Sequence, residues 1–436
     1  MRQQLEQYFE FARLATNWRT EILAGFTTFI TMAYIVFVNP AILQETGMPF
    51  QAVVAATCLS AAVGSILMGT LARYPIALAP GMGLNAYFTY TVCKGMGIAW
   101  QVALGAVFIS GVVFLILTAL GVRQLIVRAI PPDLYGAVAV GIGLFIAFIG
   151  LKNSGIVVAD PATLLTLGDM HKQSTLLALF GLLLTSALLA WKVRAAMLIG
   201  VLTTTAAGAL TGQIHWDPKF YSVSEITATA FKLDIVGALK IGLFEIVFVF
   251  LFVDMFDNIG TLVAVSKKAG LHDPATGEIP RVNRILMADS LATITGSLAG
   301  TSTVVSYIES AAGVVAGGRT GVTAIVTGLL FLVALVIAPV IGVIPAAATA
   351  PALIIVGSLM VSQVNGIQWE DPGLAIPAFL TMITIPLTFS IANGLAFGLT
   401  SYTLIKLLRG RLAEVNWMEG LLAALFIVRF VYLAKA

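Results

Sequence analysis

Apolar runs of about 17–22 residues recur from one end of this chain to the other, and that repetition restricts what the chain can fold into. A helix of this length crosses a hydrocarbon layer of about 30 Å. The chain is 59% hydrophobic and only 10% charged, whereas an average soluble domain carries about 25% charge. The net charge of +3 is small and the basic residues gather in connections, which argues against a nucleic-acid surface. We therefore expect an all-α integral membrane protein whose surroundings are a lipid bilayer.

The runs predict about 14 transmembrane segments. The continuous ones are 22–43, 51–72, 100–120, 133–151, 174–191, 195–213, 240–263, 282–300, 320–341, 346–363, 372–390 and 391–408. Two more, 75–92 and 302–317, are apolar but interrupted by Pro, Gly, Ser and Thr. The last stretch, 417–433, is amphipathic and is expected to lie at the interface or the periphery.

The basic residues between these segments predict the orientation of the chain. Sixteen of them fall on the side that holds both termini, and six fall on the other side. The first set is Arg2, Arg13, Arg19, Arg73, Arg123, Arg128, Lys192, Arg194, Lys267, Lys268, Arg281, Arg284, Arg319, Lys406, Arg409 and Arg411, and the second is Lys94, Lys152, Lys172, Lys219, Lys232 and Lys240. Because cytoplasmic connections carry the excess of Lys and Arg, we expect a multi-pass protein of the cell membrane with both termini cytoplasmic.

The interrupted segments are third and tenth in order, seven crossings apart. An odd number of crossings turns the second copy over, so this spacing predicts two inverted seven-span repeats. The expected divisions are a cytoplasmic N-terminus at 1–21, repeats at 22–213 and 240–408 joined by an extracytoplasmic connection at 214–239, and an interfacial helix within 409–436. In transporters built this way, broken helices from both repeats meet near the midplane and form the substrate site. The alternative is that Pro80 and Gly81 only kink a helix.

Asp257 is the first candidate for such a site. An acid at the centre of a membrane helix costs about 2.5–3.5 kcal/mol on insertion scales, so it usually faces a cavity or a pathway. Thr261 lies four residues later on the same helix face, and Asp254 lies near that face. We place Asp254 and Asn258 in a supporting role. The alternative for Asp257 is a buried acid that packs one helix against another.

Glu309 is the second candidate, in the tenth segment. Ser310 and the small residues that follow it predict a half-helix that starts there and points free backbone N–H groups at a ligand. Tyr307, two residues before the acid, is placed with it among the substrate-binding residues. Two acids that converge on one cavity cannot both ionise cheaply, so Asp257 and Glu309 are expected to share a proton and to carry proton coupling.

The third segment offers an amide instead of an acid. Asn85 presents one acceptor and two donor positions, which suit a flat heterocycle with alternating donors and acceptors. Pro80, Gly81 and Gly83 are expected to break the helix and support it. The alternative for Asn85 is a capping amide that satisfies the broken backbone.

Other polar residues are assigned no site. Asp289 is expected to pair with a base or to cap a helix, and Glu245 is expected to be structural. Cys58 and Cys93 fall in apolar stretches without a nearby His, so we expect neither a disulfide nor a metal. No cofactor is predicted.

Four long motifs make the chain resemble the AzgA-like purine permeases, a branch of the nucleobase–cation symporter superfamily. They are Trp18–Tyr34 with Asn39 and Pro40, Ala72–Tyr87, Asp257–Thr261 and Tyr307–Gly313. The resemblance implies a core domain at 22–120 plus 240–341 and a gate domain at 133–213 plus 346–408. It implies import of hypoxanthine, guanine or adenine by proton symport. The family's acids in the eighth and tenth segments match Asp257 and Glu309, and its third-segment amide matches Asn85.

One position departs from the related uracil permeases. Those proteins have a proton-coupling histidine four residues after the eighth-segment acid, where this chain has Thr261. The proton must therefore use Asp257 or Glu309. An ionised Glu309 facing a ring N–H favours the oxopurines hypoxanthine and guanine, whereas a protonated one could serve adenine.

Three other readings of the chain remain at this stage. A channel would need a symmetric pore or filter rings, and an anion exchanger on the same fold would need a cation or dipoles in place of two acids. A membrane enzyme would need a metal cluster or a nucleophile–base pair, which the spans lack. A homodimer stays open.

Overall fold

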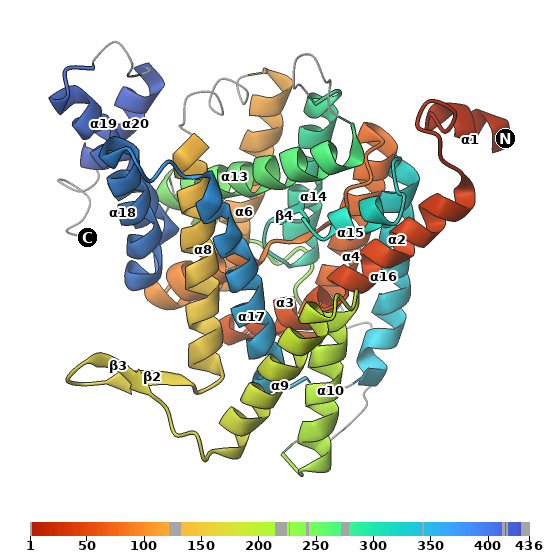
Figure 1. Ribbon diagram of the computed structural model, residues 1–436, viewed down its shortest axis with the longest axis horizontal. Helices are drawn as coiled ribbons and strands as arrows, with labels where there is room; N and C mark the ends of the chain where they lie inside the picture. The colour runs from red at the N-terminus through yellow and green to blue at the C-terminus, as the bar shows by residue number, and fades with distance from the viewer. Residues whose placement is uncertain are drawn as a thin grey trace. The chain divides into compact units, whose positions relative to one another are not determined.

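The computed structural model describes residues 2–121, 132–213, 225, 227–240, 244–271, 279–341, 344–411, 415 and 417–428 (Figure 1). Its elements are α1 (Arg2–Tyr8), α2 (Trp18–Met32), α3 (Ile35–Leu43), η1 (Gln44–Thr46), α4 (Phe50–Leu67), η2 (Met68–Ala72), β1 (Leu78–Pro80), α5 (Met82–Ala86), η3 (Tyr87–Gly95), α6 (Trp100–Ala119), α8 (Pro132–Asn153), β2 (Val157–Asp160), β3 (Leu164–Leu167), α9 (Gln173–Ala190), α10 (Ala196–Leu210), α12 (Ile235–Lys240), α13 (Phe244–Ala269), α14 (Val282–Ala299), β4 (Val304–Ser306), α15 (Ser310–Val315), α16 (Gly321–Ile341), α17 (Ala346–Met360), η4 (Val361–Gly366), α18 (Pro372–Thr388), α19 (Ile391–Leu408) and α20 (Trp417–Val428).

The helices follow the apolar runs of the sequence. Within the described ranges, 8 helices are long and apolar enough to cross a membrane, and the predicted seventh, eleventh and thirteenth segments form shorter apolar helices. The predicted third and tenth segments are broken into strand and helix. The predicted stretch 417–433 is helical over Trp417–Val428, and its remainder lies outside the described residues, as does most of the predicted connection 214–239.

The first predicted segment, 22–43, lies within one apolar helical span, Trp18–Thr46. The span has a local irregularity, since α2 ends at Met32 and α3 begins at Ile35. Ala33 and Tyr34 between them keep right-handed helical dihedral angles, and the N–H groups of Val36 and Phe37 donate to carbonyls three residues earlier.

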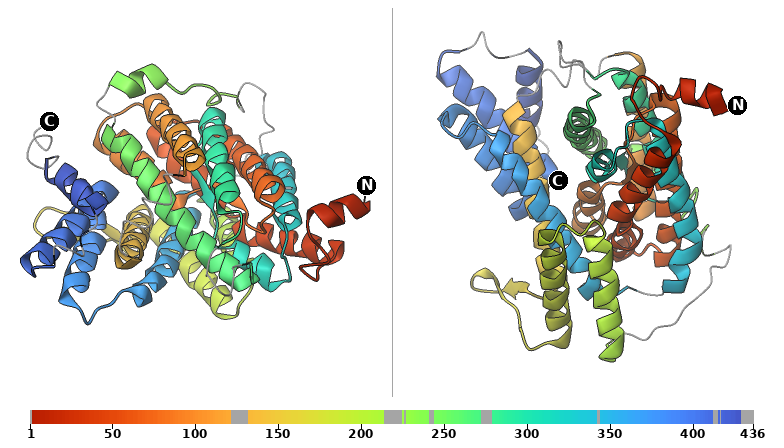
Figure 2. Two further views of the ribbon diagram at one scale, coloured as in Figure 1. Left: turned by 90° about the horizontal axis from the view of Figure 1, so that it is seen from above. Right: turned by 45° about the vertical axis from the view of Figure 1, so that its right-hand side comes forward.

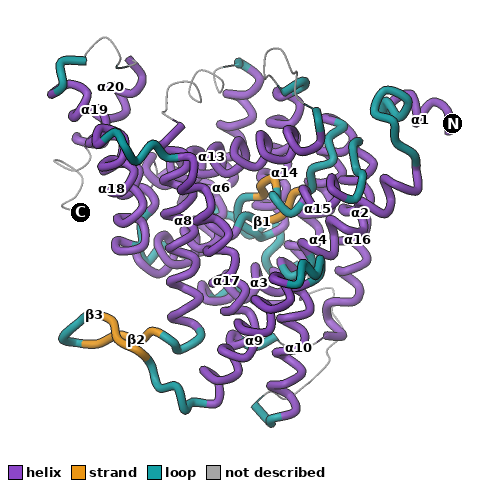
Figure 3. The backbone as a smooth tube through the Cα atoms, viewed as in Figure 1, coloured by secondary structure: helices purple, strands orange, loops and turns teal. Residues whose placement is uncertain are grey.

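The two strands lie at the centre of the packing between the repeats. β1 pairs with β4 in antiparallel fashion, with Leu78 opposite Ser306 and Pro80 opposite Val304 (Figure 3). Both strands are buried. Non-helical backbone at membrane depth is tolerated only where protein or a water-filled cavity satisfies it, and here each strand satisfies the other.

A hydroxyl from the second span of each repeat secures the strand that follows. Ser65 of α4 donates to the carbonyl of Leu78 at 3.2 Å and accepts from its N–H at 3.0 Å. Thr293 of α14 makes the same two bonds with Val304, at 3.0 Å and 3.2 Å. The two strands are thus held by the same device, once in each half of the chain.

The helix contacts show the relation between the two predicted repeats (Figure 2). Where two helices pack together, their counterparts seven segments away also pack together. Helix α2 packs against α15 and α16, and its counterpart α13 packs against α5 and α6. Helix α4 packs against α16, and its counterpart α14 packs against α6. Helices α4 and α14, themselves counterparts, pack against each other. A two-fold relation between inverted repeats produces this interchange.

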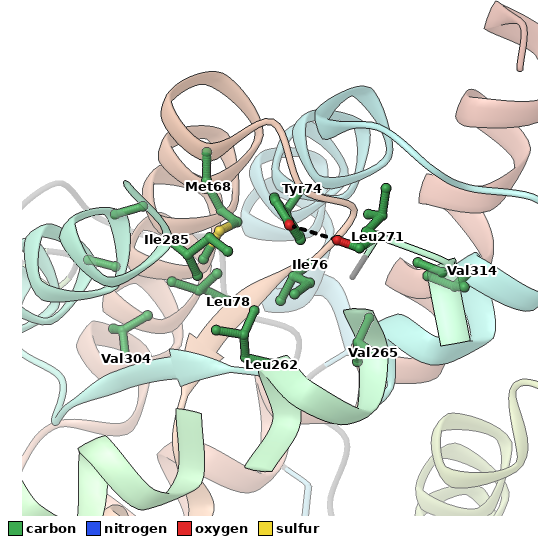
Figure 4. Packing of buried hydrophobic residues seen from close by; sticks show 14 residues of the cluster. Met68, Tyr74, Ile76, Leu78, Leu262, Val265, Leu271, Ile285, Val304 and Val314 are labelled. Atoms are coloured by element: carbon green, nitrogen blue, oxygen red, sulfur yellow. Dashed lines mark hydrogen bonds between the residues drawn. The ribbon is translucent and has the colours of Figure 1, made fainter. Parts of the chain in front are cut away.

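Apolar side chains fill the space around the strands (Figure 4). Leu78 of β1 and Val304 of β4 are fully buried together with Ile285 of α14 and Leu262 and Val265 of α13. Burial of a whole aliphatic side chain contributes about 1.5–3 kcal/mol in water, and close packing fixes the geometry in lipid as well. This cluster therefore holds the backbone from which the candidate acids project.

The chain divides into two compact units. The larger comprises Met1–Ala119 and Gly150–Leu353, and the smaller comprises Leu120–Ile149 and Ile354–Ala436. The larger unit contains the predicted core spans and also α9 and α10; the gate domain at 133–213 plus 346–408 stays a prediction. In the smaller unit, α18 packs on α19 and α19 on α20.

Candidate functional site

Asp257 projects from the middle of α13, a helix of 26 residues. Its side chain is partly exposed, whereas Asp254 and Thr261 on the same helix are buried. Asp257 lies close enough to Glu309 for the two charges to interact. The structure therefore brings together the two acids that the sequence analysis singled out, from helices of one repeat that pack against each other.

Glu309 lies just before α15, where β4 has ended and the helix begins at Ser310. Its side chain is also partly exposed. The expected free N–H groups are not observed here: the amides of Ser310, Ala311 and Ala312 donate to carbonyls three residues earlier, at 3.1, 2.9 and 2.9 Å. That expectation was wrong because the chain closes into a tight turn before α15 and uses those donors. Recognition at this point rests on the carboxylate.

Tyr34 is a contact of Glu309 that the sequence analysis missed. Its hydroxyl donates to Oε1 of Glu309 at 2.7 Å, and its ring is buried. Tyr34 lies in the turn between α2 and α3, a local irregularity inside the first membrane span. The residue falls inside a motif that the sequence analysis quoted, but nothing in the local pattern showed that its hydroxyl would reach Glu309.

Tyr307 lies near both acids. Its hydroxyl donates to the carbonyl of Pro80 and its N–H donates to the carbonyl of Ala77 at 3.0 Å. The side chain thus ties the tenth segment to the third. Its ring, buried beside Asp257 and Glu309, forms part of the surroundings of the acids.

Asn85 is fully buried in α5, and both ends of its amide are engaged by the protein. Nδ2 donates to Oδ1 of Asn39, and Ser302 donates to Oδ1 of Asn85. Asn39 in turn donates to Thr57 at 2.7 Å and to Thr301 at 3.0 Å. This geometry favours the alternative kept open above, an amide that holds the broken backbone, over direct contact with a substrate.

The residues around Asn85 shape the break. Pro80 ends β1, and the N–H of Gly81 donates to the carbonyl of Thr303 at 2.9 Å. A Cβ at Gly81 would lie 2.9 Å from Cγ2 of Val305, so a larger residue here would displace the Val305 side chain. Gly83 lies buried within α5.

A second group of polar side chains is centred on Asn258, the residue that follows Asp257. Nδ2 of Asn258 donates to Asp254 and to Asp289, each at 2.7 Å, and all three side chains are buried. Oδ1 of Asn258 accepts the N–H of Ser306 at 2.8 Å. Asp289, which the sequence analysis expected to pair with a base or to cap a helix, accepts this amide bond on Oδ2. Asn258 thus links the eighth, ninth and tenth segments.

The site can bind a polar ligand and exchange protons. Asp257 and Glu309 present two acceptors with partial exposure, and Tyr34 adds a donor beside one of them. Asn85 contributes to holding the broken third and tenth segments together, through bonds with Asn39 and Ser302. Thr261 is buried on α13.

Comparison with known proteins identifies the family of the chain. The family model Xan_ur_permease, described as "Permease family", matches residues 19–397. The chain belongs to this permease family. It is a transporter and not an enzyme, and the resemblance to the purine permeases is confirmed.

Three relatives show how close the match is. The chain is 54% identical over 431 residues to the putative permease MJ0326 of Methanocaldococcus jannaschii, covering 99% of each chain. It is 45% identical over 441 residues to the guanine/hypoxanthine permease PbuG of Bacillus subtilis, covering 98% of this chain and 100% of the relative. It is 43% identical over 429 residues to the adenine permease AdeP of Escherichia coli, covering 98% and 96%.

Solved structures show the fold. The transmembrane domain of the cyanobacterial bicarbonate transporter BicA superposes with a TM-score of 0.63 at 15% identity, covering 88% of this chain and 98% of that one. SLC26A9 superposes with a TM-score of 0.68 at 10% identity, covering 94% and 69%. The permease therefore has the expected all-α membrane fold of two inverted seven-span repeats with core and gate domains.

Proposed function

We propose that the permease imports purine nucleobases by proton symport, with the base held by Asp257 and Glu309. The observation that carries this proposal is the approach of these two partly exposed acids from α13 and from the start of α15. Carboxylates are strong acceptors for the ring N–H groups of a base, and such charge-assisted bonds contribute about 1.5–3 kcal/mol. The guanine/hypoxanthine and adenine permeases among the relatives support a purine as substrate.

Hypoxanthine and guanine are the preferred substrates in this proposal. Both oxopurines offer an N1–H to an ionised carboxylate, whereas adenine has a bare N1 and a 6-amino group. The oxopurine preference therefore requires an ionised Glu309, whose Oε1 accepts the hydroxyl of Tyr34. An adenine preference is the alternative, and one of the relatives is an adenine permease.

The coupled proton is assigned to the same pair of acids. Two carboxylates in one low-dielectric cavity repel each other, so the pair retains a proton that a single acid would release. Thr261 cannot take this role because its hydroxyl does not titrate in the physiological range. Binding of a base to the ionised acid and of a proton to the other reduces the charge of the pair from two to one, and the hydrogen bonds of the base satisfy the remaining carboxylate while the core moves past a gate within the cell membrane, with both termini cytoplasmic.

Transport of an anion is the competing function, because BicA, which shares the fold, is a bicarbonate transporter. The shared fold is compatible with this alternative. Two acids at the site would repel an anion, so the side chains argue against it.

Uptake in cells that lack their own purine permeases tests the proposal. Labelled hypoxanthine should accumulate more as external pH falls from about 8 to about 6, and a protonophore should abolish accumulation. A panel of unlabelled bases supplies the competition: guanine should displace hypoxanthine strongly and adenine weakly. Uptake that follows a sodium gradient at fixed pH would refute proton symport, and strong competition by adenine alone would refute the oxopurine preference.

A further inference from the structure

The hairpin formed by β2 and β3 presents an exposed apolar face. Its strands pair in antiparallel fashion, with Val157 opposite Leu167 and Ala159 opposite Leu165. Residues directly opposite each other in such a pair point to the same side of the sheet, so these four side chains form one face, called here the apolar face. Leu167 is 67% exposed and Leu165 is 44% exposed. The largest side chains of the apolar face therefore lack a cover.

The opposite face of the hairpin has a different character. Asp160 and Thr166 lie on it beside Val158 and Leu164. Oδ1 of Asp160 accepts the N–H of Thr163 at 2.8 Å, which closes the turn at the tip of the hairpin. An isolated two-stranded hairpin is marginally stable in water, and an uncovered apolar face marks a contact with a membrane or with another protein. The two faces thus predict a hairpin that is covered on one side and wet on the other.

The position of the hairpin points to lipid as the cover. The hairpin joins α8 to α9 through short connections, and both helices are long and apolar enough to cross a membrane. Figures 1 and 2 show it extending sideways from the axis of α9, level with the first part of that helix rather than beyond its end. Because α9 is an apolar span, a hairpin at this level lies at the membrane and not in bulk water.

The backbone of the hairpin limits how deep it can lie. A sheet of two strands leaves a row of N–H and C=O groups along each outer edge, and hydrocarbon offers these groups no partner. Water and lipid headgroups do offer partners. The apolar face therefore fits the boundary between headgroups and acyl chains, with the edges and the mixed face toward the headgroups.

A second copy of the chain fits the apolar face less well. A stable protein interface takes about 20–30 residues from each side, whereas this face consists of four side chains on two strands of four residues. Charge also gives no reason for a protein partner or for anionic lipid, because Lys152 and Lys172 are balanced by Asp160 and Asp169. The chemistry of the face matches a zwitterionic lipid surface.

We propose that the β2–β3 hairpin is a membrane-interface anchor: its apolar face lies on the acyl chains at the headgroup boundary and holds the start of α9 at a fixed depth. The inference rests on the membrane fold and does not depend on which substrate the permease carries.

Collision measurements on nitroxide labels test the anchor in the full-length protein in phosphatidylcholine vesicles. Oxygen concentrates in lipid and a nickel chelate stays in water, so the ratio of their collision rates with a label reports lipid contact. The label at Leu167→Cys should give a ratio several-fold above that at Thr166→Cys, its exposed neighbour on the opposite face. Cys58 and Cys93 are buried, and wild-type protein taken through the same labelling supplies the background.

The other outcomes overturn the anchor. Low ratios at both labels would place the apolar face in water, and high ratios at both would show a hairpin immersed in lipid. Exclusion of both reagents at Leu167→Cys would mean that protein, such as a second copy, covers the face. If Leu167→Cys does not fold, Leu165→Cys on the same face decides by the same ratio. None of these results bears on the proposed transport of purines.

Discussion

The third and tenth segments share one architecture and use it for different ends. Each runs from a buried strand into a short helix, each strand is held by a hydroxyl of the preceding span, and the strands pair with each other. The polar side chain of the third segment, Asn85, is fully buried with both amide ends bonded to protein. That of the tenth, Glu309, is partly exposed and bonded to Tyr34 on one oxygen.

The difference shows how a repeated fold produces one asymmetric site. A fully buried amide that is bonded to protein at both ends stabilises the break and exposes no atom to a ligand. A carboxylate with partial exposure keeps an acceptor free. We infer that the first half of the chain supplies most of the scaffold, with Tyr34 as its contribution to the site, and that the second half supplies both acids.

The largest expected effect is a loss of transport in a variant of Asp257, the acid on the continuous helix α13. Asp257→Asn keeps size and hydrogen-bonding capacity but removes the titratable group, so accumulation of labelled hypoxanthine should be abolished while the protein still reaches the membrane. Asp160→Asn, at a partly exposed acid of the β2–β3 hairpin, should transport normally. Normal accumulation by Asp257→Asn would remove Asp257 from the mechanism.

The second-largest expected effect is a loss of affinity in a variant of Glu309, the polar residue of the broken tenth segment. Glu309→Gln replaces a charge-assisted bond to the base by a neutral one, and calorimetric affinity for hypoxanthine should fall roughly ten- to hundredfold. Glu45→Gln, which breaks only a surface ion pair with Lys94, serves as the control and should bind as the wild type. Equal affinities in both variants would mean that Asp257 alone holds the base.

Asn85 should respond in stability more than in affinity. Asn85→Ala leaves buried groups of Asn39 and Ser302 without their partner, at a cost of about 1–3 kcal/mol each in the free energy of unfolding. The melting temperature in detergent should fall clearly, and the folded fraction should bind hypoxanthine with only a few-fold loss. A hundredfold loss of affinity at unchanged melting temperature would place Asn85 on the base and erase the contrast between the segments.

The smallest effect probes what the segments have in common. Ser65→Ala and Thr293→Val each remove the hydroxyl that holds one strand, and each should lower stability by about 1–2 kcal/mol, measured by thermal unfolding. Similar losses are expected because the two hydroxyls make the same pair of bonds. A loss confined to Thr293→Val would show that only the strand before Glu309 depends on its anchor.

The sequence located most of the fold and the two acids without help. Apolar runs specify membrane helices because their length matches the bilayer, and the interrupted third and tenth segments specify the repeat because Pro, Gly and small residues cannot continue a regular span. Asp257 and Glu309 were found because a carboxyl group in a membrane span is costly and is retained only for a reason. Each of these signals is local, which is why the sequence carries it.

Partnerships between distant residues were decided by the tertiary structure alone. Tyr34 and Glu309 lie 275 residues apart. The turn at Ala33 and Tyr34 contains no Pro or Gly, so the sequence gives no signal for it. From the sequence, Asn85 could bind the substrate or stabilise the broken backbone. Only the positions of Asn39 and Ser302 in the structure favour the stabilising role. A side chain's type fixes which bonds it can make, but burial and neighbours determine which of them remain for the substrate.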